Sequence, residues 1–293
     1  MAWTHYPLKF RLQSPMHIGY RKVGNLMQTR QYVPGKNLWA ALTARIARDH
    51  LDGSDANSYK KIGEHAKNKF RFSYLWPSLD GEKPYFHWAH EDFDYLLLDS
   101  CASTALDHSA HSAEEGSLHE TEFISPVTRD ERKVYLLGDL WVKDGLPVEM
   151  TRWQAAMENL QLGGERTYGW GRLELCSDDW KENSSGSGMT AAGHPWWEYG
   201  GKIFLELDEG KKITSHALAS PPGGPEGTDC LLANAKAGCR DVVGPVEPLV
   251  GWEWGSPARV CYRGVYFMPG GKVIKRARFK IDCFGRLCKM DGL

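Results

Sequence analysis

Several stretches of the chain have the residue patterns of strands. Residues 8–13, LKFRLQ, alternate apolar and polar side chains, which is typical of a half-buried strand. Residues 133–142, KVYLLGDLWV, predict a second strand. The segments FRFSYLW at 70–76 and PYFHWAHEDFDYLLL at 84–98 are rich in aromatic and β-favouring residues, so both indicate further extended structure.

A helix is predicted soon after the first strand. Leu38, Leu42 and Ile46 recur at fourfold spacing within residues 36–49, as on the apolar face of an amphipathic helix. The turn Pro34-Gly35 precedes this helix, and a long polar, glycine-punctuated connection, SPMHIGYRKVGNLMQTRQYVPG, leads to it. The chain therefore begins with a strand, a loop and a helix.

A second helix follows the strand at 133–142. Thr151 and Gln154 have the spacing of a capping box, in which two side chains satisfy free backbone donors at a helix start. The apolar face of this helix is formed by Trp153, Ala156, Met157 and Leu160. Glycine accepts the left-handed conformation at a helix end, so Gly163 and Gly164 end the helix before the strand LELC.

These elements predict an α+β fold of two domains. The first, residues 1–176, has the order β-α-β-β-α-β with an insertion at about 99–131. The polar residues 177–200 form the expected linker, and residues 201–293, which open with the strand KIFLELDEG, form a smaller β-rich domain. A chain of 293 residues with 42% apolar side chains is long enough for two cores.

Neither a membrane span nor a signal peptide is indicated, so we expect a cytoplasmic protein without membrane contact. The seven cysteines form no CxxC pair, which argues against a disulfide framework. Loose spacing leaves one alternative open, a zinc site formed by Cys230, Cys239, Cys283 and Cys288. No cofactor is expected.

The formal net charge of −1 is unevenly distributed. Against the single acid Asp282, the C-terminal end carries a basic strip of Lys272, Lys275, Arg276, Arg278, Lys280, Arg286 and Lys289. A local strip of this kind can follow a phosphate backbone although the whole protein is nearly neutral. The alternative is a strand with a solvated basic face, and the same alternative holds for Lys60, Lys61, Lys67, Lys69 and Arg71.

Residues 162–173, LGGERTYGWGRL, contain four glycines, two arginines and two large aromatic residues. Glycines let backbone N–H groups approach a ligand, Arg166 and Arg172 can contact phosphates, and Tyr168 or Trp170 can stack on bases. With Thr167, these residues form a candidate RNA contact. The loop also has a structural explanation, because a short connection between helix and strand needs glycine for its dihedral angles.

Four motifs occur in order along residues 8–175: SPMHIG, YVPGKNLWAAL, AEEGSLHETEF and LGGERTYGWGRLEL. Together they resemble the RAMP superfamily, the RNA-binding subunits of CRISPR effector complexes. The resemblance implies one or two ferredoxin-like, RRM-like domains, a glycine-rich loop after the last helix of the first domain, and binding to crRNA.

The second half contains EPLVGWEW and, further on, YFMPGGKV. These segments resemble the C-terminal domain of the capping subunit of type III-like complexes, which holds the repeat-derived 5′ handle of the guide. The partners that this implies are the crRNA, an adjacent RAMP backbone subunit, a large or nuclease subunit and, indirectly, target RNA.

The insertion at 99–131 is polar, so we expect a protruding hairpin. The resemblance implies a thumb-like element that contacts guide bases or a neighbouring subunit, with His108 and His111 among the expected RNA contacts. Three alternatives remain here. His108, His111 and His119 with a carboxylate could hold a metal, two histidines could act as general acid and base, and Asp107 is the candidate in a target-cleaving subunit.

Further RNA contacts are expected close to the first strand. His17, Tyr20, Arg21, Lys22 and Arg30 follow it, although a histidine at position 17 can equally be a core residue. Lys36 and Asn37 begin a helix, where backbone N–H groups and the helix dipole attract a phosphate.

The sequence therefore favours a non-catalytic guide-RNA-binding subunit that caps a ribonucleoprotein filament. Two alternatives are an endoribonuclease that processes precursor crRNA and a protein-interaction module without RNA contact.

Overall fold

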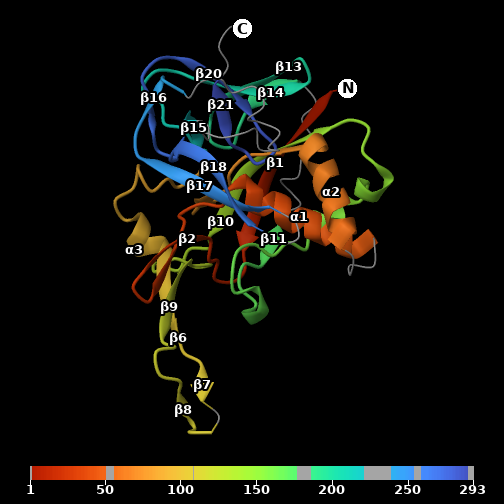
Figure 1. The fold of residues 1–293 in the computed structure, drawn as a ribbon. Helices are drawn as coiled ribbons and strands as arrows, with labels where there is room; N and C mark the ends of the chain where they lie inside the picture. The colour runs from red at the N-terminus through yellow and green to blue at the C-terminus, as the bar shows by residue number, and fades with distance from the viewer. Residues whose placement is uncertain are drawn as a thin grey trace.

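The computed structural model describes residues 2–50, 56–107, 109–176, 186–220, 239–253 and 259–289. Its architecture is mixed α and β, with several sheets and few helices (Figure 1). Within the described residues, no helix combines the length and the apolarity that crossing a bilayer requires.

A five-stranded antiparallel sheet forms the centre of the first half. Its path is β11 (Leu173–Leu175), β1 (Trp3–Leu12), β10 (Tyr135–Lys143) and β4 (Phe70–Phe72), and β5 (Trp76–Ser78) also pairs with β10. The helices that cover this sheet are α1 (Gly35–His50), α2 (Ala56–Lys69) and α4 (Trp153–Met157), and the 3₁₀ turns of this half are η1 (Val148–Met150) and η2 (Arg166–Tyr168). The strands predicted at 8–13 and 133–142 and the helix predicted at 36–49 are thus confirmed.

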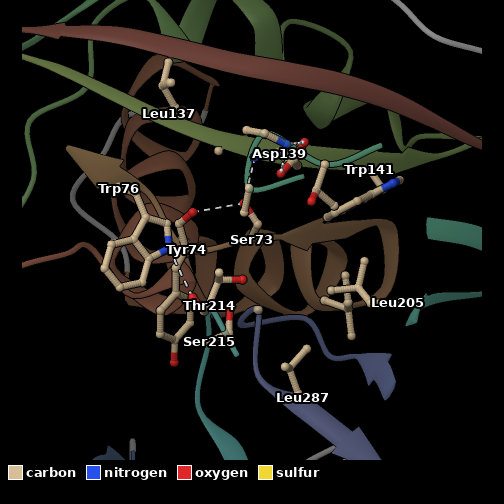
Figure 2. Close-up of a pocket in the computed structure, with 16 residues that line it drawn as sticks. Ser73, Tyr74, Trp76, Leu137, Asp139, Trp141, Leu205, Thr214, Ser215 and Leu287 are labelled. Atoms are coloured by element: carbon tan, nitrogen blue, oxygen red, sulfur yellow. Dashed lines mark hydrogen bonds between the residues drawn. The ribbon is translucent and has the colours of Figure 1, made fainter. Parts of the chain in front are cut away.

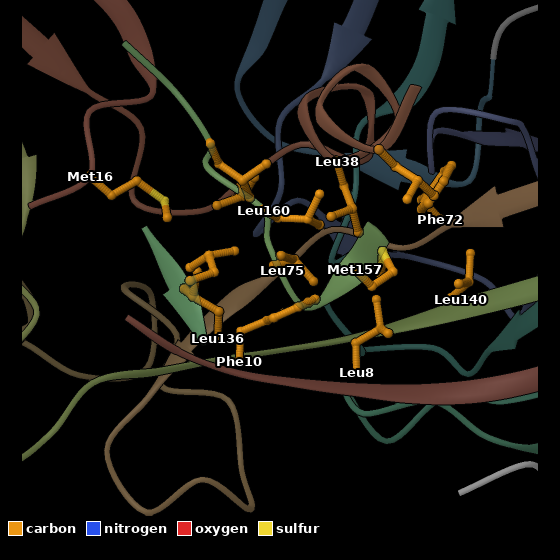
Figure 3. Packing of buried hydrophobic residues seen from close by; sticks show 14 of the residues in the cluster. Leu8, Phe10, Met16, Leu38, Phe72, Leu75, Leu136, Leu140, Met157 and Leu160 are labelled. Carbon is orange, nitrogen blue, oxygen red and sulfur yellow. The ribbon is translucent and has the colours of Figure 1, made fainter. Parts of the chain in front are cut away.

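The two faces of this sheet are buried against different neighbours. Leu8 and Phe10 of β1 and Leu140 of β10 belong to the core that α1, α2 and α4 cover (Figure 3). The alternate residues of the same strands, among them Trp3 and Trp141, pack instead against the second half of the chain. Burial on both faces explains why residues 133–142 form an apolar run rather than an alternating pattern.

The second half is built on an eight-stranded sheet. Its order is β12 (Ser187–Met189), β13 (Pro195–Tyr199), β14 (Lys202–Leu207), β20 (Ala277–Ile281), β21 (Leu287–Lys289), β15 (Ala217–Ser220), β18 (Arg259–Phe267) and β17 (Val246–Glu253), with β16 (Val242–Val243) paired to β19 (Lys272–Val273) beside it. No helix occurs among its described residues, so the RRM-like arrangement is not found there. The expected linker contributes β12 and β13 to this sheet, and its residues 177–185 lie outside the described part.

The two halves meet across a polar contact on the sheet face opposite the helices. The buried Asp139 carboxylate accepts a hydrogen bond from His5 Nε2 at 2.9 Å and from the backbone N–H of Ala191. Ser73, Asp139 and Trp141 lie opposite Thr214 and Ser215 in Figure 2. The cavity between them measures about 20 Å³, room for a single water molecule, so it is no ligand site.

A third sheet carries a long arm. Its order is β2 (Gly19–Val23), β3 (Leu26–Thr29), β9 (His119–Ile124) and β6 (Leu98–Ser103), preceded by α3 (Phe93–Leu97), and the tip pair is β7 (Leu106–Asp107) with β8 (Ser112–Ala113). The arm of β6 to β9 projects far from the body in Figure 1, as the predicted hairpin should. The connection before α1 contains the β2–β3 hairpin.

Three local expectations were wrong. The Thr151 hydroxyl donates to the Val148 carbonyl instead of capping a helix, and α4 begins at Trp153 without a side-chain cap. Residues 56–69, expected only as a basic stretch, form α2 because Ile62 and Ala66 face the core. Within 84–98, turns and α3 replace most of the expected extended structure.

The glycine-rich loop is bound tightly to the segment after β1. Gly171 N donates to Pro15 O at 2.7 Å, and Gly164 N donates to His17 O at 2.9 Å. A Cβ atom on Gly163 would lie 2.2 Å from His17 O, and one on Gly171 would lie 1.8 Å from Leu162 O. These two glycines are therefore required by backbone contacts within the protein.

We predict that Gly171→Ala destabilises the protein more than Gly193→Ala does. Both glycines have φ of 75°, but only Gly171 has backbone within 4 Å of the added methyl. Gly193→Ala should cost about 1 to 2 kcal/mol for the left-handed conformation alone, and Gly171→Ala roughly 3 kcal/mol or more. Urea unfolding measures both, and equal losses would contradict the close approach at Gly171.

We also predict that acid destabilises the fold. Burial lowers the pKa of His194 from 6.5 to about 4, so this imidazole stays neutral in the folded state, whereas the unfolded chain takes up a proton below about pH 6.5. Its contribution to stability is therefore lost as the pH falls from about 6.5 towards 4. Between about pH 7 and pH 5 the wild type should lose about 2 kcal/mol more than His194→Gln in urea unfolding. Parallel losses in the two proteins would count against a neutral buried His194.

Candidate functional site

An exposed ridge lies at the outer side of the glycine-rich loop. We define the loop ridge as Arg166, Thr167 and Tyr168 of η2 together with Arg172, all of which are exposed, and the Tyr168 side chain is 80% exposed. The turn starts and ends at residues with left-handed backbone, Glu165 and Gly169. Two cations and one aromatic ring on a short rigid turn can contact phosphates and one base.

The loop ridge is held in place from behind. Trp170 is half-buried and packs edge-on against Phe123 of β9, with ring centroids 5.0 Å apart. Gln161 Nε2 donates to the carbonyl oxygens of Arg166 at 2.9 Å and Trp170 at 2.7 Å. Trp170 therefore joins the loop to the base of the arm, a role different from the expected base stacking.

His17 is buried at the same junction. Its Nδ1 is 2.7 Å from the Glu122 carbonyl oxygen, and its ring packs beside Gly164. The side chain is only 9% exposed, so its visible role is to bind the loop and β9 together. This is the core arrangement that the sequence left open as an alternative.

The β2–β3 hairpin presents a second group of exposed residues, Tyr20, Arg21 and Lys22. Arg21 Nε donates to Gln28 Oε1 at 2.6 Å, which fixes the arginine across the hairpin. The guanidinium groups of Arg21 and Arg30 lie 5.3 Å and 4.8 Å from the centre of the Tyr20 ring. The hairpin thus combines cations with an aromatic ring, as the sequence predicted.

Arg30 is engaged inside the protein. Its two terminal nitrogens bind the Glu247 carboxylate at 2.7 Å and 3.1 Å, and Nη1 also donates to the Tyr32 hydroxyl at 2.9 Å. Only 13% of the Arg30 side chain is exposed. Arg30, one of the expected RNA contacts, thus forms a bidentate ion pair that connects the end of β3 to β17 of the second half.

The same carboxylate binds a buried histidine. Burial alone would raise the pKa of Glu247, but hydrogen bonds from His216 and Arg30 outweigh it and lower the pKa to about 2. Burial lowers the pKa of His216, which keeps the ring neutral. A neutral ring that donates from Nε2 to Glu247 accepts at Nδ1 from the Tyr74 hydroxyl, 2.7 Å away. Sequence reasoning did not select Glu247, His216 or Tyr74 as site residues, because they come together only in the folded chain.

The start of α1, the expected phosphate site, is partly covered. A Cβ on the buried Gly35 would lie 2.6 Å from the Phe284 carbonyl oxygen, so the second half packs directly on this turn. Asn37 N donates to Pro34 O. Lys36 remains exposed, and its Nζ lies against the backbone of β17 at Gly251.

The C-terminal basic strip is largely paired with acids. Arg276 and Arg278 both bind Glu206, Lys289 binds Asp241 at 2.7 Å, and the buried Arg286 binds Asp282 at 2.8 Å. Two of these three acids, Glu206 and Asp241, lie outside the basic stretch in sequence. The strip is therefore mainly a set of ion pairs. Among the described residues, its exposed lysines Lys272 and Lys275 form none.

The arm does not gather a catalytic or metal site among its described residues. Asp107 accepts hydrogen bonds from Ser109 and from the backbone N–H of Ala110, and these bonds lower its pKa. His111 is exposed at the tip, and His108 lies outside the described residues. Across the described ranges, no three His, Cys, Asp or Glu side chains come close enough to hold a metal; Cys230 falls outside these ranges, while Cys239, Cys283 and Cys288 are buried.

A cavity of about 240 Å³ opens between the hairpin, the base of the arm and the second half. It brings together Tyr20, Arg21 and Arg30 of the predicted site with residues that sequence reasoning missed, namely Gln28, Thr29, Gln31, Tyr32, His87, Asp94, Leu98, Glu122, Met268 and Pro269. Some of these residues belong to segments that the sequence analysis quotes, with Tyr32 in YVPGKNLWAAL, Glu122 in AEEGSLHETEF, and Met268 and Pro269 in YFMPGGKV. His87, Asp94 and Leu98 belong to the aromatic segment 84–98, and no pattern in any of these segments marks a residue as lining a cavity. The hairpin side of the candidate site is therefore a concave surface.

Comparison with known proteins gives no match to a family model and none to a curated protein. Among solved structures, this chain is similar to a chain of the Type III-B Cmr-beta bound to cognate target RNA and AMPPnP, with 12% identity and a TM-score of 0.45, over 91% of this chain and 85% of that one. It is also similar to a chain of the Type III-B Cmr-beta bound to cognate target RNA, with 13% identity and a TM-score of 0.39. A chain of the Type III-B Cmr-beta in the apo state has 11% identity and a TM-score of 0.37. Each of these two similarities covers 58% of this chain and 96% of the other chain. Similarity at this level leaves the function to be argued from the residues.

Proposed function

We propose that this protein is a non-catalytic, guide-RNA-binding subunit of a CRISPR effector ribonucleoprotein, which holds the repeat-derived 5′ handle of the crRNA and caps the backbone filament. The loop ridge carries the proposal. Arg166, Tyr168 and Arg172 all face solvent on a turn whose glycines fix the backbone. An exposed Tyr between two exposed Arg residues is suited to a single strand with unstacked bases.

The topology of the first half supports a ferredoxin-like domain. In chain order the sheet strands are β1, β4, β10 and β11, and in space they lie as β11-β1-β10-β4, all antiparallel, with helices on one face. This is the arrangement expected of a β-α-β-β-α-β unit in which the last strand pairs with the first. The RAMP resemblance of residues 8–175 covers the same unit.

The arm supports the part of the proposal that concerns protein partners. Residues 99–122 contain six carboxylates, Asp99, Asp107, Glu114, Glu115, Glu120 and Glu122, and neither Lys nor Arg. Such an arm repels phosphates and fits a basic protein surface. Leu106 and Leu118, 64% and 58% exposed, provide apolar contacts on the same arm. We infer that the arm contacts an adjacent backbone subunit or a large subunit of the complex. The complex would act in the prokaryotic cytoplasm, and this protein would contact target RNA only indirectly.

We predict that Arg166→Ala with Arg172→Ala weakens the binding of a short labelled single-stranded repeat RNA and flattens its salt dependence. Each lost phosphate contact should change the slope of log K against log salt by about 0.7, or about 1.4 for the pair. Fluorescence anisotropy at several salt concentrations measures the slope. The matched control is Arg276→Ala with Arg278→Ala, two exposed arginines already paired with Glu206, for which the slope should not change. An unchanged slope in the first variant would remove the loop ridge from the RNA site.

We further predict that the purified protein does not cleave repeat RNA, with EDTA or without it. The reason is the position of Asp107, whose carboxylate accepts hydrogen bonds from Ser109 and from the backbone N–H of Ala110 within the tip turn. Denaturing gel electrophoresis after incubation tests this. Cleavage that persists in EDTA and disappears in His111→Ala would establish the endoribonuclease alternative instead.

A further inference from the structure

The cavity beside the β2–β3 hairpin has the size of a site for one small group. Its volume of about 240 Å³ is below the roughly 300 to 1,000 Å³ of sites for drug-sized ligands. Its walls come from three parts of the chain: the hairpin, the start of α3 and β6 with Glu122 of β9, and the turn Met268–Pro269 after β18. An oligonucleotide cannot enter this space, whereas one nucleobase can.

The charges around the cavity disfavour a phosphate. Arg21 and Arg30 line it together with Asp94 and Glu122. The charge of Arg30 is already compensated by Glu247, which leaves two carboxylates against one guanidinium. Burial lowers the pKa of His87 to about 4, so this ring adds no positive charge at neutral pH. An anion would therefore lose hydration in the cavity without gaining a net attraction.

Two carboxylates among the residues that line the cavity each use one oxygen within the protein. Glu122 Oε2 accepts from Thr29 N at 2.8 Å, and Asp94 Oδ1 accepts from Gln31 at 2.5 Å. Within the described residues, the second oxygen of each carboxylate has no recorded donor. Adenine, cytosine and guanine carry an exocyclic amino group that can donate to such an oxygen, and uracil carries none.

Apolar and aromatic surface completes the site. Tyr20 lies at the wall of the cavity and is 36% exposed, and Leu98, Met268 and Pro269 provide apolar contact. The Arg30 guanidinium lies 4.8 Å from the centre of the Tyr20 ring, and its bonds to Glu247 and Tyr32 hold it there. A planar base entering this space meets an aromatic ring and two carboxylate acceptors on walls that are already formed.

We propose that this cavity binds one unstacked nucleobase bearing an exocyclic amino group, with Glu122 and Asp94 as the acceptors that select it. The inference rests on the proposed RNA-binding function and adds a base-specific position to it. The sugar-phosphate strand stays outside, where Lys22 and the loop ridge are exposed. The carboxylates thus exclude the phosphate and recognise the base by accepting hydrogen bonds from its amino group.

The test compares the full-length wild type with Glu122→Gln combined with Asp94→Asn. The probes are short labelled oligo(A), oligo(C) and oligo(U), and fluorescence anisotropy gives a Kd for each. Replacing charged acceptors by amides keeps the shape of the site and an oxygen for Thr29 N. The variant should bind oligo(A) and oligo(C) about tenfold more weakly and oligo(U) as the wild type does, since a hydrogen bond to a charged group is worth about 1.5 to 3 kcal/mol.

The matched control is Glu114→Gln with Glu115→Gln, which also removes two carboxylates but on the exposed part of the arm, away from the cavity. It should leave all three Kd values unchanged relative to one another. A second variant, Met268→Trp, fills the cavity without altering its charge, and it should weaken oligo(A) and oligo(C) binding while the salt slope stays that of the wild type.

The outcomes separate the two proposals. Suppose that the wild type binds RNA with the expected salt slope. If both cavity variants then change the Kd values of all three probes equally, or change none of them, the base site is overturned and the RNA-binding function stands. If the wild type binds none of the probes, the proposed function itself fails and the base site with it. Circular dichroism of each variant establishes that a lost preference does not come from unfolding.

Discussion

The pairing of β1 with β10 is the constraint on which the rest of the structure depends. The two strands are in antiparallel register over nine residue pairs, from Trp3 opposite Lys143 to Arg11 opposite Tyr135. One face of this pair packs against the helices and the other against the second half. A shift of this pairing by one residue would turn Asp139 towards the apolar core. It would also move the core leucines of β10 to the face that carries His5, so the register is strongly specified.

That register also places the loop ridge. The segment after β1 runs directly along the glycine-rich loop, where Pro15 and His17 accept hydrogen bonds from Gly171 and Gly164. The backbones approach so closely that two positions of the loop accept only glycine. The glycines therefore serve the protein's own packing, and the exposed side chains between them are left for a ligand. The structural explanation offered for this loop is confirmed for its glycines, and RNA contact stays a prediction for the exposed side chains.

The ion pair of Arg30 with Glu247 decides how the second half meets the hairpin. Both side chains are nearly buried, and His216 and Tyr74 extend the hydrogen-bond network into the interior. Removing one partner of such a pair leaves an uncompensated buried charge, which is strongly destabilising. The network fixes Arg30 over Tyr20 and thereby one wall of the base-sized cavity.

Sequence alone determined the elements whose signal is local. Periodicity in residues 8–13 and 36–49 predicted a strand and a helix that the structure contains, and the polarity of residues 99–131 predicted the projecting arm. Polar residues on a short loop also indicated the exposed ridge around Tyr168. These predictions succeed because side-chain alternation and solvent exposure are properties of neighbouring residues.

Tertiary structure decided every feature that depends on a distant partner. The partner of Arg30, Glu247, lies 217 residues away in the sequence, so no local pattern could predict that the charge of Arg30 is already paired. The basic strip was neutralised in the same way, since Glu206 reaches Arg276 and Arg278 only across the β14–β20 pair. A charge pattern along the chain gives the sign of each group, but whether that charge is free depends on which strand is placed beside it.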